Sequence, residues 1–401
     1  MRILCCSPDY KPSIGGIAEF THQTSLALQT LGHDVFVAAP DSDGAREFDA
    51  TVGGLSTFRI GGGIVPLSQF SYLNVATKLP TFFATRRAIM DLEKWMARFV
   101  EKHGVDVVLC FHWDIFGAAA RRLRAQAGIP YYIVCYGKEI LGSGASLAGR
   151  MQHGILREAA AAITISQYTR RRLLKAVGED LNTIVSFCGV DAARFQRVSQ
   201  ADECISRYRH DGRRIVLTLG RLVERKGIDR SLDAFRICVD TLRDPSIEYW
   251  IAGDGPDRER LQAHAAQLGV GDRVRFLGAV SDEEKIRLYS AADLFVTTSR
   301  ELSDGDAEGF GIVFLEANAC ELPVVAGRSG GVEDAVQDGV TGLLVDPNDA
   351  AGIAEAMITL LSDRPRAQAM GRAGRARAMT EFSWEQVASR IVHGLRDQRG
   401  R

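Results

Sequence analysis

The chain has 401 residues, 46% of them hydrophobic, and a formal net charge of −1. This length and apolar content predict a globular protein with room for two domains. A near-neutral charge excludes recruitment of nucleic acid by a global positive field. The eight cysteines show no Cys-x2-Cys spacing, which predicts buried thiols in a reducing cytoplasm rather than a zinc site. The first apolar segment is too short for a signal peptide, and no run is long enough to span a membrane.

The N-terminal residues are expected to form a strand, a helix and a second strand, over residues 2–7, 17–31 and 35–39. This order is typical of a doubly wound α/β fold, in which ligands bind where a strand gives way to a helix. Gly15 and Gly16 lie at that junction. They do not form a Gly-x-Gly-x-x-Gly pattern, so a dinucleotide site and an NAD-dependent dehydrogenase are disfavoured.

Two later strands end in polar and aromatic residues, where pockets form in such sheets. The strand 105–110 leads to His112, and the strand 130–135 leads to Tyr136 and Glu139. His112 is either a hydrogen-bonded structural histidine or a ligand contact. Tyr136 is either a half-buried aromatic side chain at a strand end or a group that hydrogen-bonds a ligand.

A predicted helix that starts at Gln167 has a basic polar face, for which a solvated surface is the ordinary explanation. The alternative is contact with an anionic lipid surface. That alternative also draws on Phe82 and Phe83 of a long helix over 79–103 and on a second basic group, Arg121, Arg122 and Arg124.

The strand–loop–helix pattern restarts in the second half of the chain. A strand over 214–219 is followed by Arg221 and Lys226 in the loop before the next helix. An arginine binds two oxygens at once and a lysine supplies a point charge, so the pair suits a diphosphate. A basic loop without a ligand has the same composition. A strand over 274–278 ends just before Val280.

A buried strand over 293–299 leads into a polar loop and then a helix that opens near Gly311. Glu308 lies in the loop, and Glu316 lies in the second helical turn. A helix start attracts anions through its unpaired backbone N–H groups. The groups in question here belong to Phe310, Gly311 and Ile312.

Two glutamates at this spacing are, on their own, a capping acid and a solvated helix residue. Glu316, however, lies among apolar residues, which predicts a partner for its carboxylate. The segment Glu308-Gly-Phe-Gly-Ile-Val-Phe-Leu-Glu316 resembles the Glu-x7-Glu motif of retaining family-4 glycosyltransferases. The flanking segments 323–327, 329–331 and 339–347 agree. The similarity covers nearly the whole chain and is greatest to bacterial phosphatidylinositol mannoside mannosyltransferases.

The resemblance implies an α/β GT-B fold, with two Rossmann-like domains that face an interdomain cleft. Residues 1–195 would form the acceptor-binding domain and residues 196–383 the nucleotide-sugar-binding domain. The C-terminal helix, residues 384–401, would cross back to the first domain.

The resemblance also implies a site. Arg221, Lys226 and the helix start would bind the donor diphosphate, with Gly16 against it, and Val280 would lie near the nucleotide base. Glu308 would hold sugar hydroxyls and Glu316 the ribose diol. The residues implied for catalysis are Glu308, Arg221, Lys226 and Tyr136, for donor binding Gly16, Arg221, Lys226, Val280, Glu308, Phe310, Gly311, Ile312 and Glu316, and for the acceptor Tyr10, His112, Tyr136 and Glu139.

One position departs from the family. Related enzymes often have His-Gly-x-Asp/Glu where this chain has Tyr136, and tyrosine is a poor base near neutral pH. The expected activity is transfer of a hexose, mannose above all, from a nucleotide sugar to a lipid-linked or glycan acceptor. No cofactor or metal is expected, because Asp304-Gly-Asp306 is better explained as a turn. For retention, the departing phosphate would accept the acceptor's proton during front-face attack.

Three alternatives stay open. UDP-glucose or UDP-N-acetylglucosamine would replace GDP-mannose as the donor, a nucleotide-sugar epimerase would act on the donor alone, and an inactive protein would only bind it. The expected location is cytoplasmic, at the inner face of the cell membrane if the chain makes a peripheral membrane contact, with no nucleic-acid partner.

Overall fold

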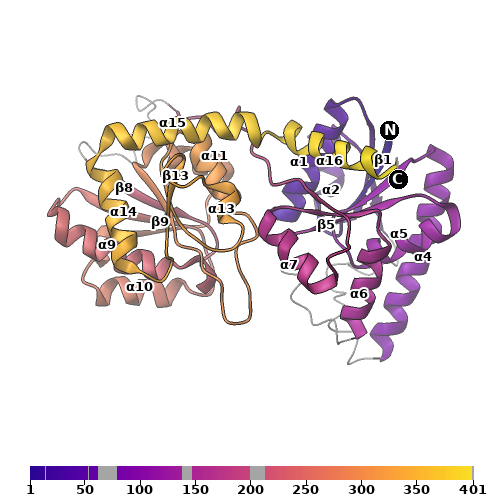
Figure 1. Ribbon diagram of the computed structural model, residues 1–401, viewed down its shortest axis with the longest axis horizontal. Coiled ribbons are helices and arrows are strands. Elements are labelled where there is room, and N and C mark those ends of the chain that lie inside the picture. The colour runs from indigo at the N-terminus through magenta and orange to yellow at the C-terminus, as the bar shows by residue number, and fades with distance from the viewer. Residues whose placement is uncertain (14, 53, 62–78, 138–146, 199–212, 400–401) are drawn as a thin grey trace. The chain divides into compact units, whose positions relative to one another are not determined.

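The computed structural model describes residues 1–13, 15–52, 54–61, 79–137, 147–198 and 213–399 (Figure 1), with the backbone alone at 79–84, 147–148 and 398–399. It divides into two compact units. The first comprises Met1–Cys188 and Trp384–Arg401, and the second comprises Gly189–Ser383. The resemblance had placed the boundary after residue 195.

The first unit is built on a seven-stranded sheet in the order β3-β2-β1-β4-β5-β6-β7, with all neighbouring strands parallel. The strands are β1 Arg2–Cys6, β2 Asp34–Pro40, β3 Ser56–Ile60, β4 Val107–Cys110, β5 Tyr131–Cys135, β6 Ala161–Thr164 and β7 Thr183–Val185. The helices are α1 Gly16–Thr30, α2 Ala45–Thr51, α4 Leu79–His103, α5 Ile115–Ala127, α6 Leu147–Glu158, α7 Gln167–Val177 and α16 Trp384–Arg399. The inner strands β4, β5 and β6 are buried throughout and almost entirely apolar, as strands covered on both faces tend to be.

The second unit is built on a six-stranded parallel sheet in the order β10-β9-β8-β11-β12-β13. The strands are β8 Arg214–Leu219, β9 Ile247–Ala252, β10 Val274–Gly278, β11 Leu294–Thr297, β12 Val324–Gly327 and β13 Gly342–Val345. The α-helices are α9 Ile228–Leu242, α10 Arg258–Gln267, α11 Asp282–Ala291, α12 Ile312–Ala319, α13 Val332–Ala335, α14 Ala350–Ser362 and α15 Arg364–Glu381. Two 3-10 turns are η3 Glu224–Lys226 and η4 Gly271–Arg273. Both units therefore have the Rossmann-like α/β architecture that the sequence predicted.

The C-terminal helix α16 belongs to the first unit and lies beside α1 (Figure 1). Its first residue, Trp384, packs edge-on against Phe20 of α1 with ring centroids 5.7 Å apart. At Gly394 the helix approaches β7 so closely that a Cβ would lie 2.4 Å from the side chain of Ile184. The last helix is thus part of the core of the first unit, although it follows the whole second unit in the chain.

Several elements were not anticipated from the sequence: β3, β7, α2, α5, α6, α10 and α11. The two strands lie at the edges of the sheet, where partial exposure weakens the apolar pattern. In α10 only Leu261 and Ala265 are buried, so the helix has almost no apolar stripe to detect.

The cysteines lie in the cores of the two units. In the part of the chain that the structure describes they are buried and form no disulfide, and Cys204 lies outside that part. Burial raises the pKa of the Cys5 thiol to about 12, which keeps it protonated and inert. Among the described residues, no helix combines the length and apolarity that crossing a bilayer requires.

Candidate functional site

Glu308 lies where two cations converge, at the carboxyl-end edge of the second sheet. Lys226 Nζ donates a 2.5 Å hydrogen bond to Glu308 Oε2, and Arg225 Nη1 lies 3.0 Å from the same oxygen. Ser299 Oγ, just beyond the end of β11, lies 3.5 Å away and also donates to Oε2. Among the described residues, no hydrogen bond reaches the other oxygen, Oε1. The carboxylate is thus hydrogen-bonded through one oxygen and can accept further hydrogen bonds at the second.

The cations determine the charge state of Glu308. Only 13% of the Glu308 side chain is exposed, and this burial by itself raises the pKa of the carboxyl. The positive charges of Lys226 and Arg225 outweigh the effect of burial and lower the pKa to about 2. Glu308 is therefore an anion at neutral pH. A carboxylate in this state accepts hydrogen bonds, as from sugar hydroxyls, and does not serve as a general acid.

The backbone of Glu308 is held by the turn that precedes α13. Gly331 N–H donates to the Glu308 carbonyl over 2.8 Å. Gly330 has φ +62°, and a Cβ there would lie 2.2 Å from that carbonyl oxygen. The Ser329-Gly-Gly331 segment is thus explained by close contact with the backbone of Glu308.

Arg300 fastens the start of the Glu308 loop. Its guanidinium donates two hydrogen bonds of 3.0 Å to the carboxylate of Asp229 in α9. Its backbone N–H donates to the carbonyl of Arg225 over 2.9 Å. The loop and η3 are thereby tied together, which keeps Lys226 opposite Glu308.

Glu316 has the partner that its apolar surroundings predicted. It is buried in α12, and the hydroxyl of Tyr289 in α11 donates a 2.8 Å hydrogen bond to Oε2. Burial and then the nearby carboxylate raise the pKa of Tyr289 well above its ordinary value. Tyr289 therefore stays protonated and remains a donor to Glu316.

The remaining donor-site residues of this unit are spread around the same sheet edge. α12 begins at Ile312 after the N-cap residue Gly311, as predicted, while the Phe310 ring is buried against Phe382. Val280 is half-buried between β10 and the capping box of Ser281.

Arg221, by contrast, is exposed, and none of the described residues forms an ion pair with it. Asp304 accepts a hydrogen bond from Asp306 N–H over 2.9 Å, and the Asp306 carboxylate lies 3.5 Å from Arg225. Asp304-Gly-Asp306 is therefore a turn. Arg221 differs from Lys226 in that it forms no hydrogen bond or ion pair with Glu308.

In the first unit, Tyr10 is buried rather than open to a ligand. Its hydroxyl hydrogen-bonds His22 Nδ1 over 2.9 Å, and the guanidinium of Arg59 lies 5.2 Å from its ring centroid. Arg59 also donates to the Lys11 carbonyl over 2.7 Å and pairs with Asp49. Tyr10 thus anchors the loop before α1 through its side chain.

The other first-unit residues lie at strand ends. Tyr136 is half-buried, with its ring edge-on to Phe20 at 5.8 Å. His112 lies 3.1 Å from Asp114, which caps α5, and this contact supports the structural interpretation of the histidine. Gly16 opens α1 with free space beside its Cα. Glu139 lies outside the described residues, as does Lys138.

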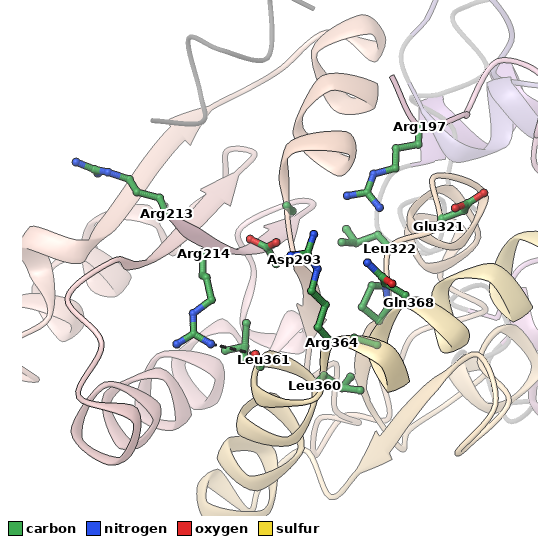
Figure 2. Close-up of a pocket in the computed structure, with 13 residues that line it drawn as sticks. Arg197, Arg213, Arg214, Asp293, Glu321, Leu322, Leu360, Leu361, Arg364 and Gln368 are labelled. Carbon is green, nitrogen blue, oxygen red and sulfur yellow. Dashed lines mark hydrogen bonds between the residues drawn. The ribbon is translucent and has the colours of Figure 1, made fainter. Parts of the chain in front are cut away.

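A separate cavity of about 280 Å³ lies at the opposite edge of the second sheet, at the amino ends of β8, β11 and β12 (Figure 2). Four arginines are among its lining residues, and two are already paired: Arg213 with Glu248, and Arg214 with Asp244. Because the Glu308 loop follows the carboxyl end of β11, this cavity is not the site described above.

Sequence reasoning missed Arg225, Tyr289, Arg300 and Arg59. Arg225 was detectable, because it precedes Lys226 in the same loop. The other three meet their partners through folding alone: Tyr289 and Glu316 are 27 positions apart, and Arg300 and Asp229 are 71 apart.

Two family models match the chain. The model described as Glycosyltransferase Family 4 matches residues 14–194, and the model described as Glycosyl transferases group 1 matches residues 202–377. Together they span both units.

Full-length relatives are also similar. The GDP-mannose-dependent alpha-(1-6)-phosphatidylinositol monomannoside mannosyltransferase of Mycobacterium tuberculosis is 32% identical over 98% of each chain. That of Mycolicibacterium smegmatis is 33% identical over 99% of each chain. A glycogen synthase of Mycobacterium tuberculosis is 29% identical over 97% of this chain and 93% of its own.

Solved structures agree on the fold. Sucrose-phosphate synthase from Thermosynechococcus elongatus superposes with a TM-score of 0.78 at 24% identity over 100% of both chains. A glycosyltransferase from Rickettsia africae gives 0.76 at 17% identity over 99% of this chain and 98% of its own.

Proposed function

The chain belongs to the family-4 glycosyltransferases of the GT-B fold and is a glycosyltransferase; from this premise we propose that it transfers mannose from GDP-mannose to a lipid-linked acceptor. The choice of donor and acceptor is supported by the mannosyltransferases that are 32% and 33% identical to it along nearly the whole chain. A glycan precursor without lipid is the other acceptor class.

The observation that carries the proposal is the state of Glu308. Two cations and a serine hydroxyl hold Oε2, and Oε1 accepts no hydrogen bond from a described residue. A fixed anionic acceptor of this kind is suited to binding sugar hydroxyls. The same arrangement stabilises positive charge as it develops on the sugar ring.

The leaving diphosphate would be held by two cations, of which Lys226 lies beside Glu308. In this proposal Lys226 and Arg221 bind its oxygens, and the backbone N–H groups at the start of α12 supply further donors. The charge that grows on the leaving phosphate is then stabilised without a metal. Arg221 is exposed, so its side chain has the freedom to close on a donor.

The nucleoside would lie along the same sheet edge. Glu316, oriented by Tyr289, would accept hydrogen bonds from the ribose diol. Val280, at the exit of β10, would contact the base. Gly16, with open space beside its Cα, would allow the first unit's α1 to approach the diphosphate.

We further propose that the sugar keeps its configuration. Deprotonation of the acceptor would fall to the departing phosphate, because Tyr136 is a poor base at neutral pH. In the first unit Tyr136, His112 and Glu139 would contact the acceptor, while Tyr10 would act by holding its loop. A lipid acceptor would bring the protein to the inner face of the cell membrane, where the basic helix α7 would meet anionic headgroups.

A transfer assay tests the proposal. The purified protein is incubated with radiolabelled GDP-mannose and vesicles that contain phosphatidylinositol or its monomannoside, with and without EDTA. Lipid-bound label formed at an equal rate in EDTA, with the α-anomer identified by NMR, is the expected result. β-linked product would contradict retention, and loss of activity in EDTA would contradict metal independence.

The alternatives predict other products in the same assay. A UDP-sugar donor is the leading competitor, so the panel includes UDP-glucose and UDP-N-acetylglucosamine. A new nucleotide sugar formed without acceptor would indicate an epimerase. Binding without any product, for every donor and acceptor, would indicate an inactive protein.

A further inference from the structure

Arg225 is the second cation on Glu308, and the proposed chemistry has not yet used it. Its Nη1 lies 3.0 Å from Glu308 Oε2, and its Nε lies 3.5 Å from Asp306 Oδ2. Both nitrogens are sealed from solvent, and neither makes an aligned hydrogen bond to a described residue. The guanidinium therefore offsets the negative charge of Glu308 and Asp306, while its Nε–H and Nη1–H groups make no hydrogen bond to a described residue.

Lys226 cannot serve two anions equally well. In the ligand-free structure it donates a 2.5 Å hydrogen bond to Glu308, yet the proposed function requires it at the donor diphosphate. When Lys226 turns to the phosphates, Glu308 loses its shortest contact while it remains buried. A buried carboxylate without a cation takes up a proton, and a protonated Glu308 is a different ligand for sugar hydroxyls.

We propose that Arg225 is a positioning residue that keeps Glu308 ionised and in place while Lys226 moves to the donor diphosphate. The inference rests on the proposed function, because it assumes that a nucleoside diphosphate binds at Lys226. It concerns the phosphates and not the base, so any nucleoside diphosphate that binds can test it.

The groups that face Glu308 define this role. Lys226 and Arg225 come from η3, Asp306 comes from the loop of Glu308 itself, and Ser299 is uncharged. The turn before α13 contributes only backbone. With Lys226 removed, Arg225 is the remaining cation among these groups. Asp306, on the Nε side, orients Nη1 toward Glu308.

The test measures proton uptake when GDP binds. Isothermal titration calorimetry of the full chain in buffers of different ionisation enthalpy, between pH 7 and 9, gives the protons bound per GDP. Wild-type protein and Arg225→Gln are compared at each pH, so protonation of GDP itself cancels. The expected result is extra uptake by the variant, approaching one proton. Its affinity for GDP should fall with pH by up to about tenfold per pH unit relative to wild type.

Three further variants sharpen the result. Arg225→Lys keeps the charge and should restore wild-type proton uptake. Glu308→Gln combined with Arg225→Gln should show no extra uptake, since the titrating group is gone. Arg230→Gln removes an exposed arginine of α9 that pairs with Asp233, and should match wild type.

Several outcomes would overturn the inference. One is an Arg225→Gln variant with wild-type affinity and proton uptake at every pH. Another is an equal loss of affinity at every pH, which would mean that Arg225 itself binds the diphosphate. If Arg225→Gln does not fold, extra uptake by Arg225→Lys would contradict the proposal and its absence would support it. Failure of wild-type protein to bind GDP, UDP or ADP would instead contradict the proposed function.

Discussion

Gly330 lies directly against the backbone of Glu308: a Cβ at Gly330 would be 2.2 Å from the Glu308 carbonyl oxygen and 3.1 Å from its nitrogen. The neighbouring N–H of Gly331 donates to that carbonyl. A turn 22 positions downstream thus determines where the central carboxylate of the site lies.

Gly330→Ala should therefore damage the site. The alanine methyl would push the Glu308 loop away, adding about 1–3 kcal/mol of overpacking to about 1–2 kcal/mol for positive φ. We expect at least a tenfold loss of transfer rate and a lower Tm. Gly339→Ala is the matched control, because Gly339 has φ +72° with nothing within 4 Å. Gly339→Ala should lose only the stability that a positive φ costs an alanine, and its transfer rate should not change. An equal loss of transfer rate in Gly330→Ala and Gly339→Ala would refute this account.

Tyr289→Phe should weaken donor binding through Glu316. Removing the hydroxyl leaves a buried carboxylate oxygen without its 2.8 Å donor, at about 1–3 kcal/mol of stability. We expect a higher KM for the nucleotide sugar and a smaller thermal shift with GDP. Tyr249→Phe also deletes a buried hydroxyl in this unit, one that hydrogen-bonds Thr218 over 2.7 Å, and should lower Tm without changing KM. An unchanged KM in Tyr289→Phe would contradict the proposal that Tyr289 orients Glu316 for donor binding.

Glu308 should make the stability of the free protein depend on acid. Its pKa in the folded chain is about 2, below the ordinary value of 4.5. A lowered folded-state pKa contributes stability that is present above about pH 4.5 and is lost as pH falls toward 2. The contribution is at most about 3 kcal/mol, at 1.36 kcal/mol per unit.

This pH dependence is checked by Tm between pH 2 and 7. Glu308→Gln should be less stable than wild type at pH 7, and the two curves should converge as pH approaches 2. Glu333→Gln, at a half-exposed pair with Arg328, should track wild type throughout. A difference between Glu308→Gln and wild type that stays constant down to pH 2 would show that Glu308 is not held as an anion.

Arg59→Leu should loosen the loop before α1. Arg59 is 8% exposed in its side chain and holds Asp49, the Lys11 carbonyl and the Tyr10 ring. Breaking this cluster should lower Tm, with a cost of about 3–5 kcal/mol if Asp49 stays without a cation. Transfer to the acceptor should fall more than GDP binding does, since all of the proposed donor residues except Gly16 lie in the second unit. Arg46→Leu, 88% exposed and 3.5 Å from Asp41, should do neither. An equal loss of acceptor transfer and of GDP binding in Arg59→Leu would indicate that the loop before α1 contributes to donor binding instead.

Much of the architecture was already present in the sequence. Apolar runs such as residues 214–219 and helical periodicity over 79–103 predicted elements that the structure has with the same bounds. Local pattern suffices there because fully buried parallel strands and amphipathic helices carry their environment in their own residues. The segment from Glu308 to Glu316, together with its flanking segments, likewise carried the resemblance to the family that the relatives at 32% and 33% identity show.

Tertiary structure alone decided how those residues work. The pairing of Lys226 with Glu308 joins positions 82 apart, and the hydrogen bond from Tyr289 to Glu316 joins positions 27 apart. Tyr10 is a buried anchor because Arg59, 49 positions later, covers its ring. Sequence pattern reports what each residue needs, such as a partner for a buried carboxylate. Which group meets that need depends on chain segments that only folding brings within hydrogen-bond distance.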